Sequence, residues 1–536
     1  MESAIRLRAG EARSTLERGL RRAALTAAPG HIRARPGYLA LLGGIAGLVV
    51  ILLLSAAPHG PAPSDPVAID GLAEVVVAVL GLSLTVVAIV VQLAAQRYSA
   101  KVVDLFMSDA TNAFTFSFMV ASCVYVVVLP ALFPVAGAPW PAVALGFALA
   151  VANFALLLPY VRYVFSFLSP DNIIRTIEGS AHRSFAAAAA RGRDPEVLSA
   201  SRRAVAGAIE RIADNCLAAV GHQDRNLALH TVRTLERLVC RYHEGKAGLP
   251  PAWAEVEILA FASLSEGFHE EIVSQGLWVE AKALMEFEHI IRRAIGGMDE
   301  LVSQIASSTR VIGVRALDTD DIEVVRLVIR FFNTFIRHGL NAGNVRAIYN
   351  VLEHLRRLTV TLLRDRPELA FQITEHLHYY AHRASESGYP FVSEIIAHDV
   401  RVLCEEVYVR APADVVRFVD RFLDLDQRPE SAGGELALLG VRKAQAILGA
   451  FFLDQGEDAL AAKIRDDMRG ESSARLRRIR DGILAVTERR FWEITDRGFN
   501  FDYVDEGRRG SVGDFFEPLL RDREEEPPAE PMPLHP

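Results

Sequence analysis

The sequence predicts an all-α protein in which a four-helix transmembrane unit precedes a helical domain, either solenoid-like or a bundle. Two observations support this fold class. Residues 36–64, 75–96 and 110–161 contain no Asp, Glu, Lys or Arg, and about 20 apolar residues are enough for a helix to cross a bilayer. The chain beyond them repeats apolar residues at steps of three and four and nowhere sustains the period-two alternation of a strand.

The uncharged stretches predict four membrane spans. The first two are expected at about 38–57 and 73–95, and the 52-residue stretch has room for two more, at about 113–133 and 142–165. Proline cannot donate the hydrogen bond that a continuing helix needs, and four prolines crowd the turn between the last two spans: Pro130, Pro134, Pro139 and Pro141. We therefore assign residues 38–168 to the transmembrane domain.

Positive charges predict the orientation of these spans. Residues 1–37 carry eight Arg and three Glu, whereas the turn at 58–71 has no Lys or Arg. The next turn holds Arg97 and Lys101, the third is uncharged, and Arg162 follows the last span. Because cytoplasmic loops are enriched in Lys and Arg, we expect a multi-pass protein of the cell inner membrane with both termini cytoplasmic.

The N-terminal 37 residues form a segment of their own. Apolar residues recur at helical spacing among the arginines from Ile5 to Leu20, which is typical of a basic amphipathic helix that lies on anionic headgroups. A solvated tail that follows the positive-inside rule is the alternative.

One face of the second span is polar or small. Residues spaced three or four apart share a helix face, and this face holds Gly81, Thr85, Ala88, Gln92, Gln96 and Ser99. It is interpreted either as a seam between helices, where small residues allow close approach and Gln forms hydrogen bonds, or as the lining of a pore. No charged residue lies deep within a span, which argues against a proton relay or an ion-coupled carrier.

The run from Gln92 to Ser99 resembles the Q-L-A-x-x-x-Y-S motif of an uncharacterised bacterial family of predicted membrane proteins, a domain of unknown function. The resemblance covers about residues 38–240. It implies N-terminal transmembrane helices followed by a cytoplasmic helical region, and it implies no activity. The chain departs from the family pattern at Ala100, where members often have Pro, and at 221–225, which keeps only the Gly and the Asp of a Gly-Ile-Asn-Asp-Pro turn.

Residues 169–490 are expected to form the cytoplasmic helical domain. Ser169 and Pro170 provide a start signal, with an N-cap hydroxyl followed by Pro in the first turn. Two helix–turn–helix units, with turns near Gly221 and Asn341, resemble each other about 120 residues apart. Stacked helix pairs and a non-repetitive bundle both fit this pattern.

The end of the chain has a different composition. Aromatic and acidic residues alternate over 491–520 in a pattern that is not a regular amphipathic helix, so we expect this segment to dock on the helical body or on a neighbouring subunit. Residues 521–536 are acidic and Pro-rich and are expected to be disordered.

One cluster of possible metal ligands occurs in the helical domain. Glu375, His378 and His382 share a helix face, and His398 is placed to approach from the next helix. Such N and O donors suit zinc or another divalent ion, whereas the alternative interpretation is a partly solvated helix face. The four cysteines are spread widely and are expected to be reduced and buried: Cys123, Cys216, Cys240 and Cys404.

No pattern of catalytic residues occurs: there is no Gly-rich phosphate loop, no G-x-S-x-G and no H-E-x-x-H. We therefore expect no enzyme activity, no catalytic residue and no cofactor. The chain has a net charge of −8, and since residues 1–37 contribute +5, the remainder carries −13, which argues against a nucleic-acid partner.

The expected partners are the lipid bilayer, further copies of the chain in a homo-oligomer and a cytoplasmic protein. The sequence favours a membrane-anchored scaffold or a signalling or sensing protein with a cytoplasmic helical interaction domain. The alternative is a homo-oligomeric ion channel lined by the second span.

Overall fold

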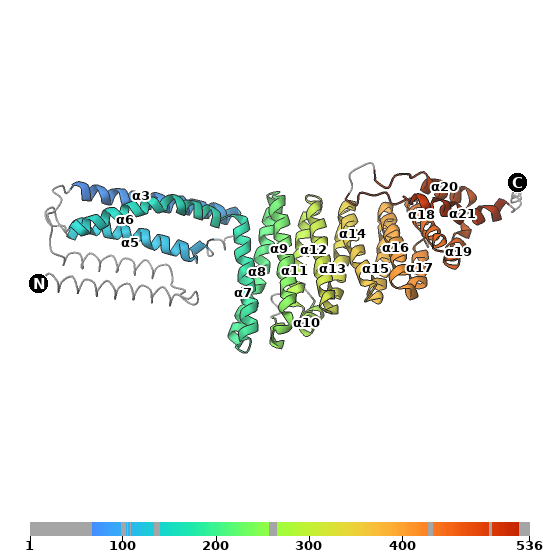
Figure 1. The fold of residues 1–536 in the computed structure, drawn as a ribbon, viewed down its shortest axis with the longest axis horizontal. Helices are drawn as coiled ribbons and strands as arrows, with labels where there is room; N and C mark the ends of the chain where they lie inside the picture. The colour runs from blue at the N-terminus through green and yellow to red at the C-terminus, as the bar shows by residue number, and fades with distance from the viewer. Residues whose placement is uncertain are drawn as a thin grey trace, which may run out of the picture. The chain divides into compact units, whose positions relative to one another are not determined.

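The computed structural model describes residues 67–97, 103, 106–107, 109–132, 140–256, 265–426, 432–491 and 496–524. Helices dominate these residues, and the only strand-like pairing among them is an isolated bridge between Arg490 and Phe499. The predicted all-α class is therefore confirmed. The chain divides into two compact units, 1–169 and 170–536 (Figure 1).

Three apolar helices form the described part of the N-terminal unit: α3 (Val67–Arg97), α5 (Ala110–Leu132) and α6 (Trp140–Phe167). Each is long and apolar enough to cross a membrane, and together they correspond to the second, third and fourth predicted spans. The predicted first span at 38–57 and the basic N-terminus lie outside the described residues.

The three helices pack on one another through a small apolar core. Val126 and Leu129 of α5 are completely buried against Val76 of α3 and Ala150 of α6. The Tyr125 hydroxyl donates a hydrogen bond of 2.9 Å to the carbonyl of Ala142, so this buried hydroxyl is satisfied inside an apolar environment.

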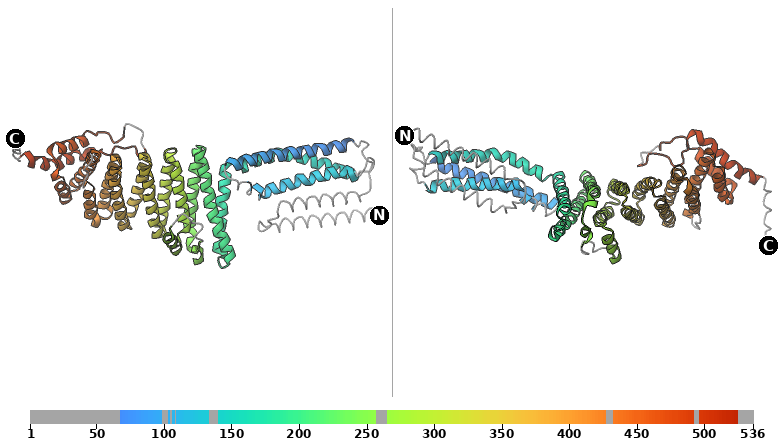
Figure 2. Two further views of the ribbon diagram at one scale, coloured as in Figure 1. Left: turned by 180° about the vertical axis from the view of Figure 1, so that it is seen from behind. Right: turned by 60° about the horizontal axis from the view of Figure 1, so that its bottom comes forward.

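The C-terminal unit is an array of paired helices. Its helices are α7 (Pro170–Arg191), α8 (Pro195–Gly221), α9 (Arg225–Gly245), α10 (Glu266–Gln275), α11 (Trp278–Ala294), α12 (Asp299–Asp318), α13 (Ile322–Asn341), α14 (Val345–Leu362), α15 (Pro367–Glu386), α16 (Pro390–Arg410), α17 (Val415–Leu423), α18 (Ala432–Asp454), α19 (Asp458–Asp467), α20 (Ser473–Leu484) and α21 (Arg509–Glu524). Figures 1 and 2 show the array from three sides.

Successive pairs stack in two layers. Helices α8, α11, α13, α15 and α17 contact one another in turn, as do α9, α12, α14, α16 and α18, and the two layers pack face to face. Apolar stripes meet between them, and Phe332, Leu358 and Ile396 are fully buried there. Of the two architectures that the sequence left open, the structure has the solenoid-like one.

The same turn recurs along the array. At six helix ends, one residue adopts a positive φ, and the next amide donates to the carbonyl five residues before it over 2.8–3.0 Å. This is the Schellman arrangement, which satisfies the last carbonyls of a helix. The positive-φ residues are Gln223, Gly276, Asp320, Gly343, Gly388 and Gly456. The turns near Gly221 and Asn341, which resemble each other in sequence, are both of this type.

The last part of the chain differs from the sequence expectation. We call residues 486–491 and 496–508 the strap, because they run as an irregular segment between α20 and α21. Residues 509–520, in contrast, are helical in α21, so the expectation of no regular helix is wrong there. The apolar residues form one buried stripe, whereas Asp514 and Glu517 lie on the exposed face. The buried stripe consists of Val512, Phe515, Phe516 and Leu519.

A cavity beneath the strap as the candidate functional site

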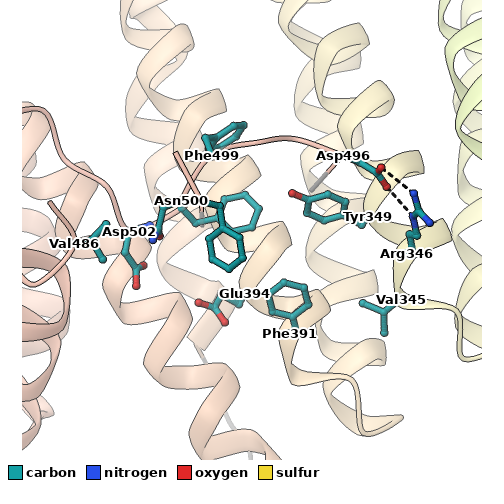
Figure 3. Close-up of a pocket in the computed structure, with 12 residues that line it drawn as sticks. Val345, Arg346, Tyr349, Phe391, Glu394, Val486, Asp496, Phe499, Asn500 and Asp502 are labelled. Carbon is teal, nitrogen blue, oxygen red and sulfur yellow. Dashed lines mark hydrogen bonds and ion pairs between the residues drawn. The ribbon is translucent and has the colours of Figure 1, made fainter. Parts of the chain in front are cut away.

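A cavity of about 730 Å³ lies where the strap meets helices α14 and α16 (Figure 3). Its walls are largely aromatic: Tyr349, Phe391, Phe491, Phe499 and Phe501. Its polar lining consists of Arg346, Glu394, Asp496, Asn500 and Asp502. Volume and lining are those of a small-molecule or peptide site, since such sites are mostly apolar with a few placed polar groups.

Arg497 attaches the strap to the array. Its side chain is only 1% exposed, and its guanidinium donates to both oxygens of Asp399 over 2.6 and 3.1 Å. It also donates to the Tyr349 carbonyl over 3.0 Å, and its Nε lies 3.4 Å from Glu353. Burial acts to lower the pKa of Arg497, but the carboxylates of Asp399 and Glu353 outweigh it and raise the pKa.

A second ion pair holds the strap at the rim of the cavity. Arg346 donates to the two oxygens of Asp496 over 3.0 and 3.1 Å, and the Asn350 amide adds a bond of 3.0 Å. These bonds, that of Arg346 first, lower the pKa of Asp496. Arg346 is more than half exposed, so this contact is weaker than the buried contact of Arg497.

Three possible metal ligands meet at the inner side of the cavity. Atoms of Glu394, His398 and Asp502 all lie within 4.8 Å of one another. The His398 ring stacks on Phe501, with centroids 5.1 Å apart and planes at 19°, and its Nε2 lies 3.5 Å from Oδ1 of Asp502. Lys443 Nζ lies 2.5 Å from the other carboxylate oxygen, Oδ2.

The ionisation of these groups follows from their burial. Burial raises the pKa of Glu394, and the neighbouring Asp502 adds to that rise. Burial lowers the pKa of the fully enclosed His398. Burial alone would raise the pKa of Asp502, but His398 and Lys443 outweigh it and hold that pKa below its usual value.

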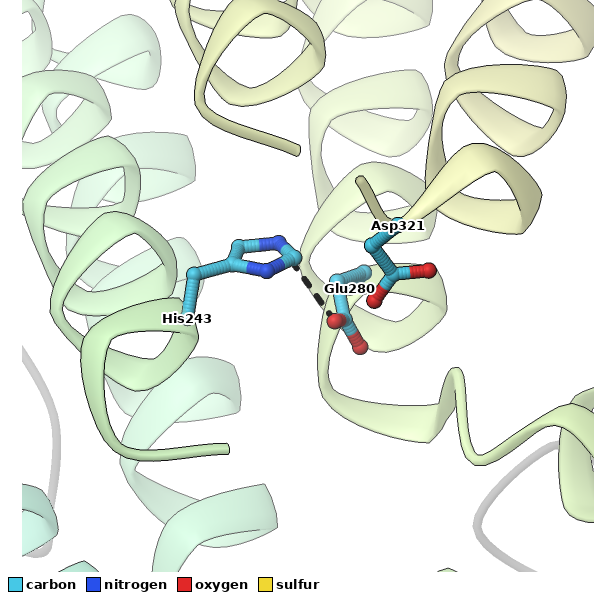
Figure 4. Close-up of side chains that lie close together, drawn as sticks. All are labelled: His243, Glu280 and Asp321. Atoms are coloured by element: carbon cyan, nitrogen blue, oxygen red, sulfur yellow. Dashed lines mark ion pairs between the residues drawn. The ribbon is translucent and has the colours of Figure 1, made fainter. Parts of the chain in front are cut away.

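A second such group lies at the other end of the array, where His243, Glu280 and Asp321 come together (Figure 4). His243 Nε2 is 3.5 Å from Glu280 Oε1. Lys246 Nζ lies 2.8 Å from that same oxygen and 2.6 Å from Asp321 Oδ2. The Lys246 ammonium thus lies between the two carboxylates, in the position that a metal ion would occupy. The group links α9, α11 and the start of α13.

The metal ligands proposed from the sequence are not brought together as one set. His378 and His382 lie side by side on α15, with ring centroids 4.6 Å apart. His398 instead faces Asp502, and neither three-residue group among the described residues contains Glu375, His378 or His382. Asp502 was missed because only the fold brings it to α16. The only signal in the sequence was its place in the aromatic-acidic segment.

The polar face of the second span lies on α3. Gly81, Thr85 and Gln92 are exposed in the N-terminal unit, and the Thr85 hydroxyl donates to the Gly81 carbonyl over 2.8 Å. The side chain of Gln96 and all of Ser99 lie outside the described residues.

Fold and composition together define a predicted membrane protein with several apolar helices and a helical repeat-like domain. Residues 34–226 match the model of a family described as "predicted membrane protein (DUF2254)", a domain of unknown function. The resemblance to a family of predicted membrane proteins is thereby confirmed. The matched region includes the N-terminal unit from residue 34 and continues through α8.

No curated protein matches the chain. Among solved structures, the chain matches a "circular tandem repeat protein with novel repeat topology and enhanced subunit contact surfaces". It is 14% identical over 90% of this chain and 97% of its own, with a TM-score of 0.26.

Proposed function

We propose that this protein is a membrane-anchored scaffold or signalling protein whose helical array binds a partner in the cytoplasm. In this proposal the apolar helices hold it in a bacterial inner membrane, and both termini face the cytoplasm. Binding, rather than catalysis, is its activity. The arginine-rich N-terminus and the alternation of positive and non-positive turns support the orientation.

The cavity beneath the strap is the observation on which the binding role rests. It combines about 730 Å³ with aromatic walls and an ion pair at its rim. Phe391 lines it and is 49% exposed. An accessible aromatic side chain in a cavity with largely apolar walls supports the binding of another molecule there, since ligand sites are mostly apolar clefts with a few polar groups.

Site-specific photo-crosslinking in cells tests this role. A photoreactive residue at position 391 of the full chain is expected to give a discrete crosslinked product. Val409 is the matched control, because it is also exposed, at 72%, and lies on the same helix, about 27 Å away at 1.5 Å per residue. Identical products from both positions, or no discrete product from position 391, would contradict the proposal.

A homo-oligomeric ion channel is the second candidate. Thr85 and Gln92 are exposed on α3, and a polar face on a membrane helix requires a partner or water. In a ring of subunits, that face would line the pore. This function requires an oligomer and a measurable ion current, whereas the scaffold requires neither.

A further inference from the structure

We propose that Glu394, His398 and Asp502 bind a divalent transition-metal ion of the Zn²⁺ type at the inner side of the cavity. This site goes beyond the proposed binding of a partner and does not depend on it. One imidazole nitrogen and two carboxylates are donors that Zn²⁺ accepts, and three protein ligands leave a fourth position open. Here that position faces the cavity, which Glu394 and Asp502 both line.

The spacing of the donors suits a tetrahedral ion. Bonds of about 2.0–2.2 Å at tetrahedral angles place two ligand atoms about 3.3–3.6 Å apart. His398 Nε2 and Asp502 Oδ1 are already 3.5 Å apart. The third donor, from Glu394, is within 4.8 Å of both, so a rotation of that side chain is enough to complete the site.

Three polar atoms of this site, two on His398 and one on Asp502, are buried without hydrogen bonds. His398 is 1% exposed, and neither of its ring nitrogens forms a hydrogen bond; Asp502 Oδ1 has none either. Leaving buried polar atoms unsatisfied costs free energy, and a bound cation would satisfy Nε2 and Oδ1 together. Lys443 donates to the other oxygen of Asp502, Oδ2. A carboxylate that binds a metal ion is usually hydrogen-bonded in this way by a second residue.

The group at the other end of the array shows the contrasting case. There the Lys246 ammonium contacts both Glu280 and Asp321, so a cation already occupies the centre. His243 therefore provides a matched control: it has the same residue type, the same 3.5 Å spacing to a carboxylate and a similar burial, but its carboxylates are already paired with an ammonium.

Helix α18 restricts Glu394 on one side. A Cβ added at Gly440 would lie 2.6 Å from Glu394 Cγ, so the α18 backbone approaches this side chain as closely as only glycine permits. The carboxylate is thereby confined to the side of α16 that His398 and the strap share, which lowers the entropy lost when it binds an ion.

The full chain in detergent micelles, stripped with a chelator, tests this site by titration with Zn²⁺ and by metal analysis after desalting. We expect one Zn²⁺ per chain in the wild type and at least a tenfold loss of affinity in Glu394→Gln and Asp502→Asn. Both substitutions preserve side-chain shape, and helical circular dichroism checks that they fold. Co²⁺ in place of Zn²⁺ is expected to give the visible spectrum of a tetrahedral site.

His243→Asn and the double variant His378→Asn/His382→Asn are the controls, and both are expected to bind Zn²⁺ like the wild type. The proposal is wrong if the wild type binds no Zn²⁺ above background, or if folded Asp502→Asn and Glu394→Gln retain wild-type affinity. Loss of the ion in either control variant also overturns it, because the ion would then lie elsewhere.

Discussion

Arg497 forms the most deeply buried ionic contact between the strap and the array. Its guanidinium is enclosed between Asp399 and Glu353. The guanidinium carbon, Cζ, lies 4.4 Å from the centroid of the Tyr349 ring. Taking a charge out of water is expensive, and only a full set of partners compensates for it. Because those partners come from α14 and α16, the arginine joins the strap to two helices of the same layer.

Arg497→Met is expected to lower the free energy of unfolding of the C-terminal unit by about 3 kcal/mol. This is the lower end of the range for breaking a buried ion pair, because Arg356 still contacts Asp399 and Glu353. Arg346→Met removes the exposed pair with Asp496 and is expected to cost less than about 1 kcal/mol. Chemical denaturation of the full chain, followed by intrinsic fluorescence, measures both. Equal losses would show that burial does not distinguish the two contacts.

At the scale of the element, one glycine sets how closely two helices pack. Gly449 lies on α18 directly opposite Phe515, a fully buried side chain of α21. A Cβ at that position would overlap the Phe515 ring. Helix α21 can thus pack this closely against α18 only because α18 has no side chain at position 449.

Gly449→Ala is expected to destabilise the packing of α21 by about 1–3 kcal/mol, the usual cost of overpacking a core. Limited proteolysis should then cleave α21 earlier than in the wild type. Gly513→Ala is the matched control, because Gly513 lies within α21 and has no atom within 4 Å of an added Cβ. That substitution is expected to be neutral, or to stabilise the helix by up to about 1 kcal/mol. Faster cleavage in both variants would contradict this account.

The helices themselves were predictable and the repeat was predictable in part, whereas the cavity was not. Stripes such as the one from Ile322 to Ile336 have a period that only a helix satisfies. The repeated turn is harder to see, because its positive-φ position is Gly in four cases but Gln223 and Asp320 in the others. The cavity depends on contacts between the strap and α14 or α16, and no local pattern encodes such distant pairs.

At the scale of the whole molecule, the chain combines an apolar unit with a charged helical array. The uncharged stretches predicted the apolar helices of the first unit directly, because charged side chains are costly in the hydrocarbon core of a bilayer. The assembly of that unit does not follow from its sequence. In the part of this unit that the structure describes, three helices with a small core leave most of α3 exposed: within its apolar window only 22% of residues are buried.

The polar face of α3 is exposed among the described residues, and we predict that a second copy of the chain covers it. Gln92 is exposed on this face, and an interhelical hydrogen bond in a membrane contributes about 0.6–2 kcal/mol. Gln92→Leu is thus expected to weaken self-association about three- to thirtyfold, since 1.4 kcal/mol corresponds to a factor of ten. Native mass spectrometry of the solubilised full chain over a concentration series measures this effect.

Leu93→Ala is the control, because Leu93 is also exposed on α3 but points about 100° away from Gln92. It is expected to leave the oligomer intact. A wild type that is monomeric at every concentration would refute the prediction and, with it, the channel, because one subunit does not supply a ring. If the oligomer forms, planar-bilayer recording separates the two functions: a current that changes in Gln92→Leu supports the channel. An oligomer without current supports the scaffold, in which the same face is a seam between subunits.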